Sequence, residues 1–419
     1  MYRMFSGGTG TIQLKNRGKN KQRKSVYKKD LLYSVRICMI YCILEKRLLK
    51  SIGECVIITA ATKFWLITEK PAKDRIRGTV MPNIDYLVKR IAGMNYRAML
   101  DTARKVHERS GKNTVAALAD IMYCGFKYQA GYMDYLVFEF YNLSAGQRKT
   151  YITRGKNNYY VKLLNPQENW HLLEDKIEFL KRFDGFHGRA WIDLRETDRD
   201  TFEKFCREHP KLVAKPLDGT CGRGIEFIEL SDDSKIVGLY DMLLEGKQYL
   251  VEEFIVQHPD IGRIYPLSVN TLRLVTIRNG DTVHLVFSSM RIGNGKRVDN
   301  LNSGGMAVLV DMKSGKISTP GADKEGKAYF QHPMTGVDLV GVQIPYYQEA
   351  VELVRRAALR IPELGYIAWD VAVTEKGPII IEANHFPGHD IYQFQVHLAP
   401  DKLGLIPRFD RAVKGLSPR

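Results

Sequence analysis

Residues 365–390 read GYIAWDVAVTEKGPIIIEANHFPGHD, an apolar stretch interrupted by acidic side chains. Two short apolar runs, residues 366–373 and 378–382, have the length and the residue types of strands. The residues between them, 375–377, are of the kind that forms a tight turn. The pattern therefore predicts a β-hairpin near the C-terminal end of the chain.

Oxygen-bearing side chains lie in or next to both predicted strands. Asp370 lies in the first strand, whereas Glu382 and Asn384 are two residues apart in the second and project to one face. A buried carboxylate must be neutralised, because an unpaired buried anion is strongly unfavourable. Carboxylate and amide oxygens are ligands of Mg²⁺, which also binds nucleotide phosphates, so the hairpin suggests a metal site. The alternative is a pair of half-buried carboxylates bonded to the backbone or to arginine.

The chain has 419 residues, of which 44% are hydrophobic and 26% charged, enough for two or three packed domains of a soluble globular protein. Its formal net charge of +16 is concentrated at one end. Residues 1–78 contain 18 Lys and Arg against 5 Asp and Glu, whereas the remainder contains 45 against 42. The basic character therefore belongs to the leader and not to the body.

Residues 1–80 form this basic leader, and two hypotheses about it stay open. Residues 1–30 contain few large apolar side chains and are expected to be disordered. Either Met81 is the natural start and the leader is non-native, or the leader is an arm that makes peripheral contact with anionic lipid. Without interleaved aromatic residues, the leader does not indicate specific nucleic-acid binding.

The six cysteines and the early apolar runs favour a cytoplasmic protein. There is no CxxC pair, and no cysteine has a histidine at zinc-site spacing. The apolar runs at residues 31–44 and 55–68 are well short of the roughly 20 residues that a membrane-spanning helix needs. The leader also lacks the features of a secretory signal.

Hydrophobic periodicity predicts helices first and then a mixture of strands and helices. Helices are expected from residue 83 and at 114–122, and the aromatic run YMDYLVFEFY at 132–141 is expected to pack in the core. Strands are predicted at residues 159–164, 190–193, 211–215, 225–230, 249–256, 271–277, 283–290 and 305–310. Further helices are predicted at residues 170–183, 199–208, 236–244 and 346–360. This order indicates an α+β fold with antiparallel sheets.

A glycine-rich turn follows the strand predicted at residues 211–215. In LVAKPLDGTCGRGI, Lys215 ends the strand, and Gly219, Gly222 and Gly224 allow backbone N–H groups to approach an anion because they have no Cβ. A lysine and a glycine loop together suggest a phosphate cradle. Its spacing matches neither the Walker motif nor a dinucleotide-binding turn. A glycine-rich hairpin without a ligand is the alternative.

The strand YLVEEFIV, residues 249–256, has two carboxylates among apolar side chains. Glu252 and Glu253 mark an edge that can offer backbone groups and one acidic side chain to a purine amino group or a ribose. Salt-bridged surface glutamates are the alternative, which the segment by itself favours.

Three arginines lie on or beside adjacent predicted strands. Arg273 belongs to VNTLRLVTI, and Arg291 and Arg297 belong to SSMRIGNGKRVDNLNSGG, in which Asn300 and the glycine pair at 304–305 close the loop. Arginines that face carboxylates would stabilise the negative charge on a transferred phosphoryl group. Solvated charges on strands are the alternative.

The order of these features along the chain resembles the ATP-grasp superfamily. The order is the lysine with its glycine loop, the acidic strand, the arginine-bearing strands and the Asp…Glu-x-Asn hairpin. In particular, the chain is similar to the branch associated with sugar-transfer and surface-polysaccharide gene sets. AWDVAVTEKGPIIIEANHFPG carries the resemblance most specifically and AKPLDGTCGRGIEFI comes next, and the match covers about residues 82–419. The resemblance implies two α+β subdomains that clasp ATP between antiparallel sheets, preceded by a helical N-terminal region.

The resemblance also implies a division of the chain. Residues 1–80 are the leader and residues 81–165 the helical N-terminal region. Residues 166–247 are the first ATP-grasp subdomain, with the phosphate-binding lysines and the glycine-rich loop. Residues 248–419 are the second, with the adenine hinge, the arginines and the magnesium site.

Roles follow from the resemblance at the matching positions. The residues implied to contact ATP are Lys176, Lys215, Gly219, Gly222, Gly224, Glu252, Glu253, Phe254 and Ile255. Two Mg²⁺ ions are implied at Asp370, Glu382 and Asn384. The catalytic residues implied are Arg273, Arg291, Arg297 and Asn300; the last three recur in the order found in ATP-grasp ligases that add glutamate to a ribosomal protein.

Two positions depart from the pattern of relatives. Asn270 and Thr271 stand where many relatives carry an acidic ribose ligand, which leaves the ribose contact open. Ala368 stands where D-alanine ligases carry an arginine two residues before the metal-binding aspartate, so D-alanine ligation is not expected.

The expected activity is ATP-dependent ligation of a carboxylate to an amine through an acyl phosphate, in the modification of surface polysaccharide or the cell envelope. The substrates would be small or glycan-linked, and polysaccharide-assembly proteins are candidate partners. Two alternatives stay open: a kinase acting on a sugar or glycan hydroxyl, and a non-catalytic nucleotide-binding scaffold. His385 and His389 are expected in loop or capping roles more than at a general-base site.

Overall fold

The computed structural model describes residues 95–217 and 224–416, all within the structural unit Ile84–Arg419. The predictions for the leader, for a helix beginning at residue 83, and for Gly219 and Gly222 lie outside the described residues.

Three helices begin the described chain. Helix α4, Tyr96–Ser110, is capped by the side chain of Asn95 and ends at Gly111, whose φ of +69° suits a residue without a Cβ. Helices α5, Thr114–Lys127, and α6, Tyr132–Val137, follow, and α4 packs against both. The helix predicted at residues 114–122 is therefore confirmed and extends further.

The aromatic run at residues 132–141 packs in the interior, as predicted. Tyr135, Phe138, Phe140 and Tyr141 are all buried. The rings of Phe138 and Phe140 lie 5.3 and 5.4 Å from the ring of Tyr151, distances typical of aromatic pairs in a core.

Residues 159–164 belong to a helix, so the prediction of a strand there is wrong. Helix α8, Arg154–Leu164, begins after Thr153, whose hydroxyl accepts a hydrogen bond from the backbone of Lys156. Its buried residues are Asn157, Tyr160, Val161, Leu163 and Leu164. Tyr160 and Val161 lie three and four residues after Asn157, and Leu163 and Leu164 lie three residues after Tyr160 and Val161, which is the helical period. Six residues at the end of the helix do not reveal this period.

The helix predicted at residues 170–183 is divided in two. Helix α9, His171–Glu174, stops at Asp175, and helix α10, Lys176–Arg182, begins after it. The Asp175 carboxylate accepts hydrogen bonds from the backbone N–H groups of Ile177 and Glu178, in the first turn of α10, at 2.8 and 3.0 Å. This cap starts a new helix and places Lys176 at its first position.

The smaller sheet has four antiparallel strands in the order β1–β4–β2–β3. Its strands are β1, Trp191–Asp193; β2, Lys211–Lys215; β3, Glu226–Glu229; and β4, Leu250–Glu253. Helices α11, Arg199–Glu208, and α12, Leu239–Glu245, pack on Leu212, Ala214 and Val251 of this sheet. The strands and helices predicted in this region are confirmed, although β4 is shorter and α12 begins later than predicted.

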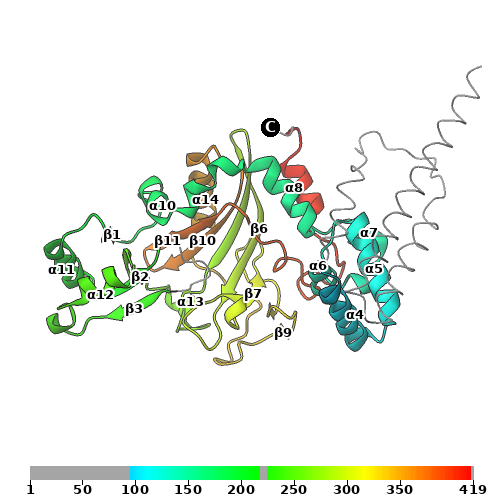
Figure 1. Ribbon diagram of the computed structural model, residues 1–419, viewed down its shortest axis with the longest axis horizontal. Helices are drawn as coiled ribbons and strands as arrows, with labels where there is room; N and C mark the ends of the chain where they lie inside the picture. The colour runs from blue at the N-terminus through cyan, green and yellow to red at the C-terminus, as the bar shows by residue number, and fades with distance from the viewer. Residues whose placement is uncertain (1–94, 218–223, 417–419) are drawn as a thin grey trace, which may run out of the picture. The chain divides into compact units, whose positions relative to one another are not determined.

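The larger sheet has seven antiparallel strands in the order β11–β10–β5–β6–β7–β8–β9 (Figure 1). They are β5, Leu272–Asn279; β6, Thr282–Ile292; β7, Met306–Leu309; β8, Gly321–Ala322; β9, Ala328–Tyr329; β10, Tyr366–Thr374; and β11, Gly377–Asn384. The C-terminal hairpin and the three strands before it are confirmed. Strands β8 and β9, with two residues each, are too short to give a periodic signal.

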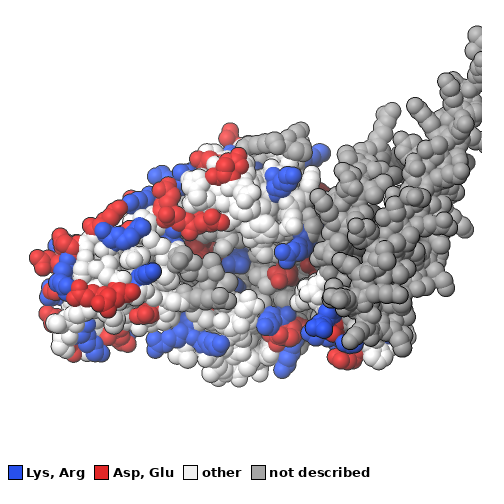
Figure 2. Space-filling model, viewed as in Figure 1, with Lys and Arg blue, Asp and Glu red and all other residues white. Residues whose placement is uncertain are grey.

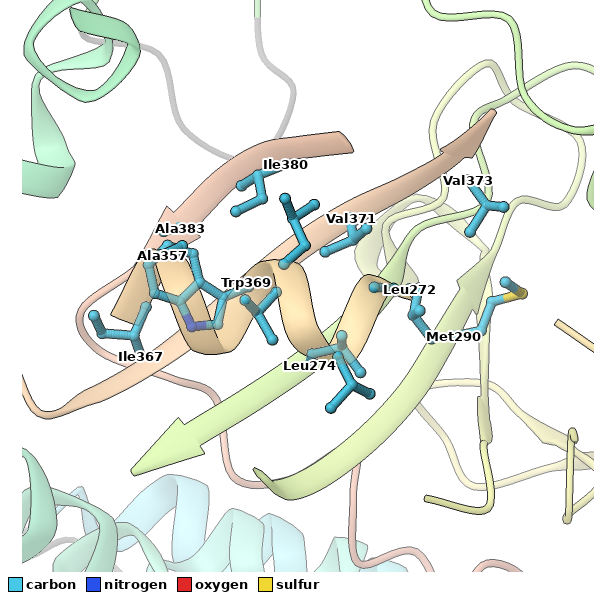
Figure 3. Packing of buried hydrophobic residues seen from close by; sticks show 14 of the residues in the cluster. Leu272, Leu274, Met290, Ala357, Ile367, Trp369, Val371, Val373, Ile380 and Ala383 are labelled. Atoms are coloured by element: carbon cyan, nitrogen blue, oxygen red, sulfur yellow. The ribbon is translucent and has the colours of Figure 1, made fainter. Parts of the chain in front are cut away.

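Both faces of the larger sheet are covered. Helix α14, Tyr347–Arg360, lies against β5, β6, β10 and β11, and Figure 3 shows Trp369, Val371 and Ile380 in that packing. On the other face, α8 and helix α15, Ile406–Ala412, form a second cluster of buried side chains with the sheet. This double cover explains why residues 366–373 are all buried and do not alternate between buried and exposed.

The remaining helices are short. They are α7, Ala145–Arg148; α13, Pro259–Gly262; and the 3-10 helices η1, Phe140–Asn142; η2, Gln167–Asn169; η3, Asp233–Lys235; and η4, Leu301–Ser303. Within the described residues, no helix combines the length and the apolar character needed to cross a membrane. On the face seen in Figure 2, basic and acidic side chains are interspersed over the described surface.

Candidate functional site

A cleft of about 1410 Å³ is lined by residues of both sheets and of helices α4, α6, α9 and α10. The predicted site residues in its lining are Lys176, Lys215, Glu252, Glu253, Phe254, Ile255, Arg273, Arg291, Arg297, Asn300, Asp370, Glu382 and Asn384. Gly224 does not belong to the lining, and Gly219 and Gly222 lie outside the described residues. The fold thus brings together side chains that are far apart in the sequence.

The side chains predicted to bind metal come from the two strands of the C-terminal hairpin. Strands β10 and β11 pair so that Asp370 lies opposite Glu382, and β10 and β5 pair so that Asp370 lies opposite Arg273. Glu382, Asp370 and Arg273 therefore form one row across three strands, which we call the carboxylate row. Asn384 lies two residues beyond Glu382, opposite Ala368.

Two arginines hold Asp370. Arg273 donates from Nε to Oδ1 at 2.7 Å and from Nη2 to Oδ2 at 2.8 Å, and Arg291 donates from Nη2 to Oδ2 at 3.1 Å. The Asp370 side chain is 1% exposed, so water does not screen these pairs. Asp370 is therefore an arginine-bonded carboxylate, which was one of the two alternatives for this hairpin.

The two carboxylates of the row differ in their electrostatic environment. Burial alone would raise the pKa of Asp370, but the charges of Arg273 and Arg291 outweigh it and hold this pKa well below its usual range. Burial and the negative charge of Asp370 raise the pKa of Glu382 to about 7. Glu382 is therefore the carboxylate that an added cation would stabilise most.

The residues at this row fit a divalent cation. A carboxylate offers about four lone-pair sites, and the arginines occupy three of those on Asp370. Glu382 and the Asn384 carbonyl add hard oxygen ligands, and the buried Asn384 Nδ2 has no hydrogen-bond partner among the described residues, so the protein does not fix that amide. Because no three His, Cys, Asp or Glu side chains cluster as a metal site in the described ranges, an ion here would need further oxygen ligands from outside the protein, such as phosphate or water.

Glu252 lies in a buried ion-pair cluster on the smaller sheet. Its side chain is 2% exposed and contacts both Lys215 and Arg189, with 2.8 Å from Arg189 Nε to Glu252 Oε1. Burial would raise the pKa of Glu252, yet the two cations lower it to about 2. Glu252 is therefore ionised and positions Lys215 in the wall of the cleft.

Arg189 is a site residue that sequence reasoning missed. Its guanidinium donates to Glu252 and also to the backbone carbonyls of His187, Ile380 and Ile381, at 3.2, 2.9 and 3.2 Å. Ile381 directly precedes Glu382, so Arg189 joins the smaller sheet to the strand that carries the carboxylate row. The sequence signal that could have pointed to Arg189 was the pair of carboxylates in the apolar strand β4. A buried carboxylate needs a cationic partner, but the sequence does not specify which residue provides it.

The segment that follows β4 has an unused backbone donor. The N–H groups of Glu253 and Phe254 donate to backbone carbonyls at 2.9 Å, whereas the N–H of Ile255 has no hydrogen bond to a described residue. Val213 and Phe227 belong to the apolar part of the adjoining cleft lining. An unused N–H beside apolar side chains suits a purine ring nitrogen.

Lys176 of α10 contacts the start of the glycine-rich turn, and Gly224 lies at its end. Lys176 donates from Nζ to the carbonyls of Pro216 and Leu217, at 3.0 and 2.6 Å. Gly224 has a φ of +71°, and its carbonyl accepts a hydrogen bond from Gln248 Nε2 at 2.7 Å. Gly224 thus serves the conformation of the turn, because a residue with a Cβ is strained at that φ.

Arg297 and Asn300 lie in the loop after β6. The Arg297 guanidinium lies over the ring of Phe227, 5.7 Å from its centroid, and forms no ion pair with a described residue, unlike Arg273 and Arg291. Asn300 caps η4 by accepting a hydrogen bond from the backbone of Asn302 at 3.0 Å. This loop therefore connects the larger sheet to strand β3 of the smaller one.

His385 and His389 take different positions. His385 lines the cleft with its ring 4.5 Å from that of Trp170, and burial lowers its pKa. His389 Nε2 lies 2.8 Å from Oδ1 of Asp134 in α6. This contact supports the structural role predicted for His389.

Comparison with solved structures finds several ligases. D-alanine–D-alanine ligase from Bacillus anthracis, solved with ATP, is 12% identical, with 58% of this chain and 65% of the other covered and a TM-score of 0.35. D-alanine–D-alanine ligase from Helicobacter pylori is 12% identical, with 59% and 64% covered and a TM-score of 0.36. Phosphoribosylamine–glycine ligase from Thermotoga maritima is 14% identical, with 53% and 50% covered and a TM-score of 0.33. Each match spans less than two thirds of the other chain.

Comparison of sequences gives a family match. Among curated proteins, none matches this chain. A family model described as sugar-transfer associated ATP-grasp matches residues 155–408, whereas the resemblance was expected from about residue 82. The match confirms the resemblance carried by the hairpin and the glycine loop, and with it the α+β ATP-grasp fold. Because it covers more than half of the chain, the protein belongs to the sugar-transfer associated ATP-grasp family.

Proposed function

We propose that the protein binds ATP in this cleft and uses it to activate a carboxylate. Family membership supports the nucleotide, and the cleft supports its orientation. Adenine would lie beside Phe227 with a ring nitrogen at the Ile255 N–H. The phosphates would extend past Lys215 and Lys176 toward the carboxylate row.

Glu382, Asn384 and the remaining lone pair of Asp370 would hold magnesium, which supplies positive charge to the phosphates when bound. Arg273 and Arg291 keep Asp370 ionised and in place. Arg291 also has a buried Nε without a hydrogen-bond partner among the described residues, 3.5 Å from a carboxylate oxygen of Asp299. Arg291 lines the cleft, so its positive charge would also stabilise a phosphoryl group in transfer.

The proposed reaction has two steps. A substrate carboxylate oxygen bonds to the γ-phosphorus while the bond from that phosphorus to the β–γ bridging oxygen breaks, which releases ADP. An amine then attacks the carbonyl carbon of the acyl phosphate and loses a proton, and inorganic phosphate leaves as the amide forms. The observation that carries this proposal is the carboxylate row with its two arginines, in the same cleft as the Lys215–Glu252 pair.

The substrates and the biological setting are part of the same proposal. The association of the family with sugar transfer supports a place in the modification of surface polysaccharide or the cell envelope. We propose small or glycan-linked carboxylate and amine substrates, handled in the cytoplasm, and polysaccharide-assembly proteins as partners.

The variant Glu382→Gln tests the proposed function. The amide has nearly the same shape but no negative charge, so we expect ADP release in the presence of carboxylates and amines to fall by about 100-fold or more. Glu349→Gln, on the exposed side of α14, is the matched control and should retain the wild-type rate. A coupled ADP assay measures the rate, hydroxylamine traps the acyl phosphate, and circular dichroism checks the fold.

The outcomes separate the candidate functions. A wild-type rate of ADP release in Glu382→Gln would contradict the assignment of the row. A stable phosphorylated product without a trapped hydroxamate would indicate the kinase instead. Binding of ATP without ADP release, whichever carboxylates and amines are supplied, would indicate the non-catalytic nucleotide-binding scaffold.

A further inference from the structure

The cleft is larger than one nucleotide requires. Its volume of about 1410 Å³ exceeds the roughly 300–1,000 Å³ typical of a site for one ligand. Besides the nucleotide-contacting residues, its lining includes α4, α6, the loop after β6 and the segment after β11. Helices α4 and α6 precede residue 155, where the family match begins, so that match assigns them no role. This second end of the cleft has room for another substrate.

Helix α4 presents two basic side chains to this end. Lys105 and Arg109 are four residues apart and thus on the same helix face, and both are exposed and line the cleft. Neither forms an ion pair with another residue in the described ranges. Lys324 and Glu325 also belong to the lining, but they pair with each other at 3.9 Å.

Asp390 adds one negative charge to the same lining. Its Oδ1 accepts a hydrogen bond from the backbone of Ile391 at 3.0 Å, and Asp390 forms no ion pair with a described residue. Beside the single carboxylate of Asp390, α4 thus presents two cations, which lie together on one helix face. A ligand that approaches α4 meets a local excess of positive charge.

Helix α6 and the segment after β11 provide apolar surface beside these cations. Met133 and Val137, four residues apart on α6, line the cleft, and so do Ile391 and Phe394. Met133 is 54% exposed, which leaves its side chain available for contact. Phe394 packs in one cluster with Leu301, the residue after Asn300, so this apolar surface adjoins the loop of the predicted catalytic residues.

Hydrogen bonds hold α6 against the chain that follows the carboxylate row. His389 contacts Asp134 at 2.8 Å, and Gln395 Nε2 donates to the backbone carbonyl of Phe138 at 2.7 Å. In α8, Asn157 Nδ2 donates to the carbonyl of Pro387 at 2.9 Å. This end of the cleft is therefore preorganised relative to β11, which lowers the entropic cost of binding a ligand there.

We propose that this end is an acceptor arm, formed by Lys105, Arg109, Met133, Val137, Ile391 and Phe394, for a substrate that carries an anionic group. The group is a carboxylate or phosphate separate from the reacting carboxylate, and Lys105 and Arg109 bind it. The apolar surface of α6 contacts the carbon skeleton. The assignment of a reacting carboxylate or amine at the other end of this substrate rests on the proposed function. The contact of the anionic group with Lys105 and Arg109 can be tested by itself.

The test uses the full chain loaded with Mg²⁺ and a non-hydrolysable ATP analogue, so that the nucleotide phosphate site is filled. Inorganic phosphate and succinate are titrated separately, and calorimetry or protein NMR measures saturable binding. We expect Lys105→Gln/Arg109→Gln to weaken this binding by about 10-fold or more, because a charge-assisted contact is lost at each position. The anion that binds more tightly distinguishes a phosphate from a carboxylate substrate.

The matched control is Lys376→Gln/Arg411→Gln, which removes the same charge at two exposed positions outside the cleft. Equal weakening in both double variants would show nonspecific attraction and overturn the proposal. No saturable binding of either anion to the loaded wild type would also overturn it. If the analogue does not bind, the titrations are repeated without it: a selective loss in the α4 variant then supports the arm while the proposed ATP-dependent function fails.

Discussion

At the scale of single residues, Arg189 connects the two parts of the site. Its side chain is 3% exposed and lies between the Glu252 carboxylate and the carbonyls of Ile380 and Ile381. Glu252 has a second cation in Lys215, but among the described residues Lys215 forms no hydrogen bond with β11, unlike Arg189. The loss of Arg189 should therefore affect both the stability of the protein and the position of the carboxylate row.

Replacement of Arg189 by methionine should destabilise the protein by about 3–5 kcal/mol, the usual cost of breaking a buried ion pair from one side. We also expect the KM for ATP to rise, with partial recovery in Arg189→Lys. Urea denaturation and steady-state kinetics measure the two effects. Arg104→Met is the control, because the Arg104 and Asp101 side chains are 61% and 51% exposed and exposed pairs contribute about 0–1 kcal/mol. Equal destabilisation in the two variants would contradict the role of Arg189.

His397 provides a pH-dependent contribution to stability. It is buried between the carbonyls of Ile391 and Ala307, each 3.2 Å from a ring nitrogen, and burial lowers its pKa from 6.5 to about 4. The unfolded chain binds a proton near pH 6.5 that the folded chain binds only near pH 4, so stability falls as the pH drops through this window. At 1.36 kcal/mol per pH unit, the loss is about 3 kcal/mol.

The variant His397→Gln should remove this titration. Other groups, including Glu382, titrate in both proteins, so the informative quantity is the difference in unfolding free energy between wild type and variant. We expect that difference to shift by about 3 kcal/mol in favour of the variant between pH 7 and pH 4. Urea denaturation at several pH values measures it, and a difference that does not depend on pH would contradict the prediction.

At the scale of elements, α8 supports the strands of the site. Asn157 of α8 donates to the Pro387 carbonyl and accepts a hydrogen bond from the Tyr366 hydroxyl at 3.0 Å, so it contacts β10 and the segment after β11. The helix depends on its first turn. Thr153, which is fully buried, donates to the carbonyl of Tyr128 at 2.8 Å and caps α8 through its hydroxyl.

Thr153→Val should therefore cost about 1–2 kcal/mol of unfolding free energy, because the methyl group fills the space of the hydroxyl but neither donates nor caps. Thr282→Val, at an exposed position of β6, makes the same chemical change without such contacts and should be nearly neutral. Urea denaturation of both variants measures their unfolding free energies. A neutral Thr153→Val would mean that α8 is stabilised by packing alone.

At the scale of the whole molecule, the proposed ATP site bridges the two sheets. Lys215 and Glu252 belong to the smaller sheet, and Asp370 and Glu382 belong to the larger one. A ligand that contacts both binds the folded state and not the unfolded chain, so it should raise the stability of the protein.

We expect ATP with Mg²⁺ to raise the melting temperature, with about 2.7 kcal/mol of stabilisation at a ligand concentration of 100 Kd. Removal of Mg²⁺ with EDTA should abolish most of this effect, and Glu382→Gln should reduce it even with the metal present. Differential scanning calorimetry measures the shift. An equal shift with ATP in EDTA would contradict metal binding at the carboxylate row while leaving nucleotide binding intact.

Much of the architecture is predictable from local patterns. The hairpin around Asp370 is recognisable because apolar runs, turn residues and carboxylates within the apolar runs occur within about 20 residues. Strand β2 with Lys215 is recognisable for the same reason. Residues 159–164 are not, because a short apolar run fits a strand and the end of a helix equally well.

The sequence by itself determined the family, the α+β class and the residues that need a counter-charge, because these depend on residue types and short spacings. The tertiary structure alone decided that Arg189 pairs with Glu252, that two arginines hold Asp370, and that Lys105 and Arg109 face the same cleft. Ion pairs and shared cavities depend on distances of a few ångströms between segments far apart in the chain. Those distances follow from the packing of the whole molecule and not from any local pattern.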